Sequence, residues 1–241
     1  MPGAYDGGMA RRSKQLDHDL KLRGRGGYRP GAGRPRVYRS RMPHRVRASI
    51  PARAPVLVTL RVKADVPRLR QRGFVEAFRE TLSRGSVRPG FRVVHYSIQN
   101  DHAHFLVEAQ HKRLLANGMK SLGARFARAV NRTFGRVGAV LKQRFHHVLK
   151  GTPREVRHAL AYVLLNVRKH YRQRRGRDAP VRLDTCSSGY WFDGWKPPAP
   201  VVAGRGPRFR EVAKPRCWLL SKGWRRHGLI RADEVPGYPS R

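Results

Sequence analysis

Apolar residues change their spacing in a regular way along the middle of the chain, and the changes predict alternating strands and helices. Over residues 55–62, β-branched and aliphatic side chains fall on every second position, the spacing typical of a strand with one buried face. After a Pro-containing turn, Phe74, Phe78 and Leu82 are four residues apart, which predicts a helix that ends near Gly85. The chain therefore enters its core as strand, turn and helix.

Two further strands are predicted over residues 92–99 and 102–109. The Asn100-Asp101 pair between them is typical of a tight turn, so the two strands should form an antiparallel hairpin. His102 and His104 stand at the start of the second strand. Since side chains alternate along a strand, both imidazoles should project from the same face, while Ala103 and Phe105 project from the other.

The remaining pattern predicts helix 113–134, strand 140–150 and helix 153–171. The third of these has the strongest start signal, because Thr152 and Glu155 form a capping box with proline at the first helical position. The element order β-α-β-β-α-β-α indicates an α+β fold. Its first six elements match a ferredoxin-like split β-α-β sheet, antiparallel with about four strands and helices on one face, followed by a C-terminal helix and irregular basic tails.

The segments that flank this core differ from it in composition. Residues 1–47 are rich in Gly, Arg and Pro without periodicity, and we predict a disordered basic arm. Within it, Arg34 and Arg36 belong to a GRPR string like that of an AT-hook, although a generic basic tail has the same composition. Residues 176–241 form an extension with four tryptophans, which could pack on the core or stack on nucleic-acid bases; their clustering with other apolar residues favours packing.

The charge points to a polyanionic partner. The 241 residues include 53 Lys and Arg against 15 Asp and Glu, a formal net charge of +38. Such an excess favours binding to nucleic acid through counterion release. Cys186 and Cys217 form no metal-binding or disulfide spacing, and no apolar run reaches the length of a membrane span. We expect a cytoplasmic protein with reduced thiols and no membrane partner.

Four residues in two elements suggest a reaction. On the helix from residue 153, Tyr162 and Asn166 are one turn apart at the margin of the apolar face, and Lys169 follows one turn later. Two imidazoles and an amide oxygen could bind one divalent cation beside a tyrosine nucleophile. Tyrosine has a pKa near 10, so the cation or a neighbour such as Lys169 would have to favour its phenolate. Each pair considered alone also fits a purely structural role.

Together these motifs carry a family resemblance over about residues 50–175. NDHAHFLVEA, GMKSLGARFARAVNRTFGRVG, KQRFHH and ALAYVLLNVRKH, in this order and spacing, resemble the single-tyrosine HUH transposases of bacterial insertion sequences, in particular the REP-associated tyrosine transposase branch. The resemblance implies that residues 48–175 are a ferredoxin-like catalytic domain. It also implies a DNA transposase that cleaves and rejoins single-stranded DNA at hairpin-bearing ends in a bacterial nucleoid, and that could be a homodimer.

The same resemblance implies a role for each site residue. Tyr162 would be the nucleophile that becomes 5′-phosphotyrosine, and His102, His104 and Asn166 would hold Mg²⁺ or Mn²⁺. From the residues alone, imidazole ligands suit Mn²⁺ or Zn²⁺ better than Mg²⁺. We further expect Lys142, Arg144 and Lys169 to contact DNA, as would Arg34 and Arg36 in the arm.

Two other classes of protein remain compatible with the sequence. A domesticated or decayed transposase would bind nucleic acid without cutting it. An RNA-binding protein of ribosomal type would explain the charge and the sheet, but gives no reason for Tyr162 and Asn166 to accompany His102 and His104.

Overall fold

The structure is a computed structural model that describes residues 51, 54–202 and 206–237. All of them belong to one compact unit, residues 42–241. The predicted basic arm, with Arg34 and Arg36, lies outside the described residues.

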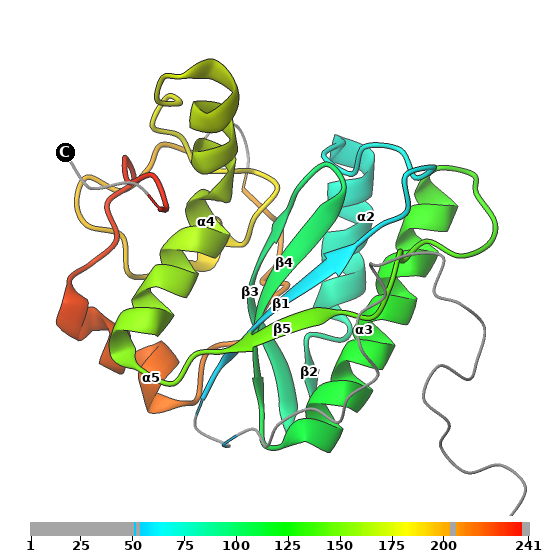
Figure 1. Cartoon of the computed structure of the whole chain (residues 1–241), viewed down its shortest axis with the longest axis horizontal. Coiled ribbons are helices and arrows are strands. Elements are labelled where there is room, and N and C mark those ends of the chain that lie inside the picture. The colour runs from blue at the N-terminus through cyan, green and yellow to red at the C-terminus, as the bar shows by residue number, and fades with distance from the viewer. Residues whose placement is uncertain (1–50, 52–53, 203–205, 238–241) are drawn as a thin grey trace, which may run out of the picture. The chain divides into compact units, whose positions relative to one another are not determined.

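A five-stranded antiparallel sheet forms the centre of the described unit (Figure 1). The strand order across it is β2-β3-β4-β1-β5, so β4 lies between β1 and β3 in the manner of a split β-α-β sheet. The strands span the following residues: β1 Val56–Arg61, β2 Val87–Arg88, β3 Phe91–Ile98, β4 His102–Ala109 and β5 His146–Leu149. The predicted α+β class and ferredoxin-like order are confirmed.

Helices cover both faces of the sheet. Figure 1 shows α2 (Arg72–Ser83) and α3 (Lys112–Thr133) on one side and α4 (Pro153–Arg175) on the other. Successive side chains of β4 project to opposite faces of the sheet, and apolar residues occupy both. Phe105 packs in the core under α2 and α3, and Leu106 packs in the core under α4. Because α4 packs on this second face, it lies over the face of β4 that carries the histidines.

Three boundaries differ from the sequence-based expectations. A two-residue strand, β2, extends the sheet beyond β3, which makes five strands instead of about four. The strand expected over 140–150 is shorter: only His146–Leu149 pair along β1, and Leu141 makes an isolated bridge to Val62. The intervening residues lack the alternation that would bury one face, so they form an exposed connection. Helix α4 has the predicted capping box and continues to Arg175, where Gly176 ends it in a left-handed conformation.

The C-terminal extension packs against α4 and the edge of β3. Its helical pieces are two 3₁₀ turns, Gly189–Trp191 and Gly223–His227, and the short α5, Trp218–Ser221. Trp224 is 1% exposed in the core beneath α4. Glu108 on β4 accepts hydrogen bonds from the backbone N–H groups of Arg216 and Cys217, which ties the extension to the sheet. Within the described residues, no helix has both the length and the apolar composition to cross a membrane.

Candidate active site

The two histidines of β4 bring their Nε2 atoms together. His102 and His104 project from the same face of the strand, as predicted, and their Nε2 atoms are 3.1 Å apart. Their rings lie nearly edge to face, with centroids 4.7 Å apart. Two nitrogen lone pairs can therefore meet at one point beside the sheet.

The neighbouring strand fixes the other nitrogen of each ring. In the β1–β4 register, Thr59 lies opposite His104, and its Oγ1 is 3.0 Å from Nδ1 of that histidine. Arg61 lies opposite His102 and donates two hydrogen bonds to Asp101, whose Oδ1 is 2.7 Å from Nδ1 of His102. A partner on Nδ1 sets the ring orientation and leaves Nε2 as the available ligand atom.

Tyr162 of α4 reaches the same point from the opposite side. Its hydroxyl oxygen is 3.2 Å from Nε2 of His104, although the two residues are 58 positions apart in the chain. The rings are in contact, with centroids 4.9 Å apart. The tyrosine that the helical spacing places one turn before Asn166 therefore lies beside the two histidines.

Asn166 lies one turn after Tyr162 and is completely buried. It was expected at the margin of the helix's apolar face, and its exposed fraction is 0%. Neither its Oδ1 nor its Nδ2 has a hydrogen-bond partner among the described residues. A buried amide without partners costs on the order of 1–3 kcal/mol, and in a native protein such a group calls for an explanation, of which an ion is one.

The electrostatics of the site keep His104 neutral and Asp101 charged. Burial, aided by the nearby charges of His102, His170 and Lys169, lowers the pKa of His104 to about 3. Burial raises the pKa of Asp101, but hydrogen bonds from Arg61 and His102 outweigh it and lower that pKa to about 2. At neutral pH, His104 therefore offers a lone pair and Asp101 carries a negative charge.

Burial also raises the pKa of Tyr162 above 10. Lys169, named as one neighbour that could favour the phenolate, places its Nζ over the face of the ring, 5.1 Å from the centroid. This placement is a cation–π contact with the ring rather than an ion pair with the oxygen. Some other charge must lower the pKa of Tyr162 if it is to react as phenolate.

His170, four residues after Asn166, is a site residue that the sequence-based reasoning missed. Its ring centroid is 6.1 Å from that of His102, and its buried Nε2 has no partner in the described structure. Burial lowers its pKa. The four-residue spacing of Tyr162, Asn166 and His170 was visible in the sequence and could have signalled that all three share one face.

The donor set of the site fits a divalent cation. Within the described residues no three His, Cys, Asp or Glu side chains cluster closely enough to form a metal centre by themselves. An amide is outside those residue types, and Asn166 has an unused oxygen. His102, His104 and Asn166 could therefore supply two nitrogens and one oxygen and leave further positions open.

A pocket of about 510 Å³ adjoins the tyrosine. Tyr162, Lys150 and Lys169 line it, and the C-terminal residues 234–237 form its far wall. Arg157 of α4 holds that wall in place, because its guanidinium donates to both carboxylate oxygens of Glu234, at 2.7 and 2.6 Å. The extension, whose role the sequence left open, thus borders the candidate nucleophile.

The other predicted contacts lie nearer the edge of the site. The backbone N–H of Lys142 donates to the carbonyl of Arg61, the residue that pairs with His102, so Lys142 lies at the same end of the sheet as the histidines. Lys142 and Arg144 are both exposed. Two other polar residues of the sheet have structural partners, because His95 is buried against Ser188 and Glu108 binds the extension.

No protein-family model and no curated protein matches the sequence. Several solved structures are similar to this chain. One is a REP-associated tyrosine transposase bound to a REP hairpin, at 17% identity and a TM-score of 0.42, covering 54% of this chain and 74% of that one. A putative transposase from Deinococcus radiodurans R1 matches at 15% identity and a TM-score of 0.34, over 48% of this chain and 83% of that one.

A bacterial tRNA(His) guanylyltransferase-like protein in complex with ATP also matches, at 15% identity and a TM-score of 0.38, over 53% of this chain and 63% of that one. The TM-scores of these three structures are below 0.5, so their likeness to this chain carries no functional argument.

Proposed function

We propose that this chain is a metal-dependent transposase-type nuclease that cuts and rejoins single-stranded DNA through a 5′-phosphotyrosine on Tyr162. One observation carries the proposal: the hydroxyl of Tyr162 meets Nε2 of His104 at 3.2 Å, and that atom lies 3.1 Å from Nε2 of His102. A tyrosine and an unpartnered amide from α4, brought to two oriented imidazoles of β4, are more than a packed core needs. The choice of hairpin-bearing ends follows the family resemblance in the sequence.

The reaction transfers a phosphoryl group without a net change in protons. The phenolic oxygen of Tyr162 attacks the phosphorus of a phosphodiester, a Tyr O–P bond forms, and the P–O3′ bond breaks. Tyr162 loses its proton to solvent through the adjoining pocket, and the released 3′ oxygen gains one proton as a hydroxyl. Rejoining is the reverse step, in which a 3′-hydroxyl attacks the phosphotyrosine and frees Tyr162.

His102, His104 and Asn166 would hold the divalent cation in this proposal. When bound, such a cation polarises a phosphoryl oxygen and favours the phenolate of a nearby tyrosine. The residues of the chain supply the geometry: Thr59 and Asp101 fix the imidazoles, and burial keeps His104 neutral so that Nε2 can ligate. Mn²⁺ fits this donor set at least as well as Mg²⁺.

The surroundings favour a flexible, negatively charged strand at Tyr162. Lys150 and Lys169 line the pocket, and Lys142 stands at the same end of the sheet as the histidines. We propose that these lysines, with exposed Arg144, hold the backbone phosphates on either side of the scissile bond. A single strand can bend into a pocket bordered by residues 234–237 more easily than a stiff duplex can.

The test is covalent capture on a hairpin DNA with single-stranded flanks, labelled at its 3′ end and incubated with Mn²⁺. Because the 5′ phosphate passes to the protein, the label should migrate with the protein on a denaturing gel, and peptide mapping should place it on Tyr162. Tyr162→Phe should abolish the adduct. Tyr171→Phe, on the same helix, is the matched control and should retain it.

Three outcomes would contradict the proposal or one of its parts. An adduct that persists in Tyr162→Phe would show that another residue is the nucleophile. Tight binding without any adduct across hairpins of varied stem and flank, in Mn²⁺ and in Mg²⁺, would favour the alternative of a non-catalytic, transposase-derived binding protein. An adduct that forms equally well with excess chelator would remove the cation from the mechanism.

A further inference from the structure

An exposed ion pair lies behind one of the two candidate metal ligands. Arg61 ends β1, opposite His102 in the β1–β4 register, so both side chains project from the same face of the sheet. The Nε and Nη2 atoms of Arg61 donate to Oδ2 of Asp101, at 3.2 and 2.8 Å. The other oxygen of that carboxylate, Oδ1, accepts from Nδ1 of His102 at 2.7 Å. Asp101 therefore links an arginine to a histidine, each through a different oxygen.

The two histidines differ in the partner of their Nδ1 atoms. His102 has a carboxylate, whose negative charge makes the imidazole a stronger electron donor to a cation at Nε2. His104 has the neutral hydroxyl of Thr59, at 3.0 Å. In metal centres generally, loss of such an outer partner lowers the metal affinity by about 10- to 100-fold. The cation affinity of this site should therefore depend more on Asp101 than on Thr59.

The contact between Arg61 and Asp101 is weak enough to be exchanged. The two side chains are 55% and 54% exposed, so water screens their attraction. Both guanidinium nitrogens share a single carboxylate oxygen instead of meeting one oxygen each. A phosphate offers two oxygens to the same planar group and matches its geometry better. A DNA phosphate close to His102 would therefore take Arg61 away from Asp101.

Such an exchange would change the charge that acts on His102. While Arg61 is bound to Asp101, its positive charge offsets part of the negative charge of the carboxylate, and the imidazole is polarised less. Once Arg61 turns to a phosphate, the carboxylate keeps its hydrogen bond with His102 alone. The affinity for a cation at Nε2 rises as a result. By thermodynamic reciprocity, the cation then raises the affinity for the phosphate by the same factor.

We propose that Arg61 binds a phosphate of the DNA strand in exchange for Asp101, so that the arrival of DNA strengthens cation binding at His102. Arg61 is then a residue that contacts the substrate, and Asp101 is a positioning residue that acts through His102. This inference rests on the proposed function, because the phosphate belongs to the strand that Tyr162 would cut. Lys142, whose backbone N–H donates to the carbonyl of Arg61, supplies a second positive charge for the same strand.

The experiment measures cation binding without cleavage. In the Tyr162→Phe protein at fixed salt, the dissociation constant for Mn²⁺ is determined from the electron paramagnetic resonance of the free ion, with and without a saturating single-stranded oligodeoxynucleotide. Asp101→Asn should weaken Mn²⁺ binding by about 10- to 100-fold. Without DNA, Arg61→Gln should tighten it by about fivefold, which corresponds to about 1 kcal/mol, the upper range for an exposed ion pair. With DNA, Arg61→Gln and its parent should bind Mn²⁺ equally, because Arg61 has already left Asp101.

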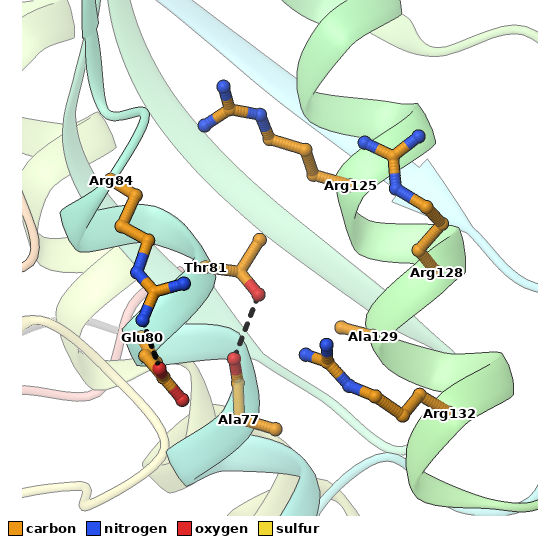
Figure 2. Close-up of a pocket in the computed structure, with 8 residues that line it drawn as sticks. All are labelled: Ala77, Glu80, Thr81, Arg84, Arg125, Arg128, Ala129 and Arg132. Atoms are coloured by element: carbon orange, nitrogen blue, oxygen red, sulfur yellow. Dashed lines mark hydrogen bonds and ion pairs between the residues drawn. The ribbon is translucent and has the colours of Figure 1, made fainter.

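Arg84 provides the matched control. It also pairs with an exposed carboxylate, that of Glu80 at 2.6 Å, but at the end of α2, on the other side of the sheet from the histidines (Figure 2). Arg84→Gln removes the same charge and should leave Mn²⁺ binding unchanged, with and without DNA. In an Asp101→Asn background, Arg61→Gln should also have no effect, because its link to His102 is gone.

Each of the following results overturns the inference. An effect of Arg61→Gln that is equal with and without DNA would mean that no exchange occurs. Parental Mn²⁺ affinity in Asp101→Asn would mean that the carboxylate does not act on His102. Mn²⁺ binding that survives His102→Ala unchanged would place the ion elsewhere. None of these results involves a covalent adduct, so a failure of the reaction proposed for Tyr162 is recognised separately, by the capture assay.

Discussion

The two faces of the sheet differ sharply in what they bury. Under α2 and α3 the packed side chains are almost all apolar, with a cluster of aromatic rings around Phe78 and Phe126, 5.2 Å apart and edge to face. Under α4, polar groups enter the interior, among them His95, His104 and Asn166. Burying polar groups costs free energy that apolar packing on the opposite face can offset. The side chains of β4 alternate between the two faces. Consecutive residues of this strand therefore belong in turn to the apolar core and to the face that carries the candidate site.

The largest predicted difference in the free energy of unfolding is between substitutions at two positions of β4 that face opposite sides of the sheet. Phe105→Ala removes a ring that is fully buried against Phe78 and should lower the free energy of unfolding by about 3–5 kcal/mol. His102→Ala, three positions earlier on the opposite face, should change it by less than about 1 kcal/mol. Urea unfolding in chelator measures both. Equal losses would mean that the histidine face is as important for stability as the aromatic core.

A smaller effect, of the opposite sign, is expected at Asn166. In chelator, Asn166→Leu should raise the stability by about 1–3 kcal/mol, because it removes a buried amide that has no partner. Mn²⁺ at 100 times its dissociation constant should stabilise the unsubstituted protein by about 2.7 kcal/mol and the variant by much less. Thermal unfolding with and without Mn²⁺ measures both quantities.

The control for that prediction lies on the other side of the sheet. Asn131 of α3 donates from Nδ2 to the carbonyl of Gly138 at 2.9 Å, and only its buried Oδ1 has no partner among the described residues, so Asn131→Leu should lower the stability by at most about 1 kcal/mol. A loss of stability in Asn166→Leu in chelator would show instead that its amide has a partner in the folded protein. The two variants therefore distinguish an asparagine whose hydrogen bond stabilises the fold from one whose burial lowers the stability.

The sequence could predict this division only in part. Periodicity within an element indicates which side chains share a face, and it correctly grouped His102 with His104 and Tyr162 with Asn166. It could not say that α4 would cover the histidine face, because that depends on packing between residues about 60 positions apart. For the same reason it missed the pairing of Arg61 with Asp101, which requires the β1–β4 register.

Two details of the site depend on the same packing. A helical wheel places Asn166 at the margin of the apolar face, and in the folded protein the residue is completely buried. Lys169 was named as a neighbour of the phenolate because it lies two turns along the same side of the helix, and its folded side chain lies over the ring of Tyr162. Spacing gives proximity but not the direction in which a flexible side chain points.

The dependence of stability on acid pH tests the free-energy cost of the polar groups buried under α4. Burial, with a smaller contribution from the charge of Arg210, lowers the pKa of His95 to about 3, and its Nδ1 is 3.1 Å from Oγ of Ser188. The unfolded chain binds a proton there near pH 6.5, but the folded chain does not, so this contribution to stability is complete above pH 6.5. It should be lost as the pH falls from 6.5 towards 3, by up to about 1.4 kcal/mol per pH unit. In His95→Leu, urea unfolding between pH 4 and 8 should show a shallower acid slope by one proton, with no change of slope above pH 7. An unaltered acid slope would mean that His95 protonates without unfolding, and that the face under α4 admits charge more readily than its burial implies.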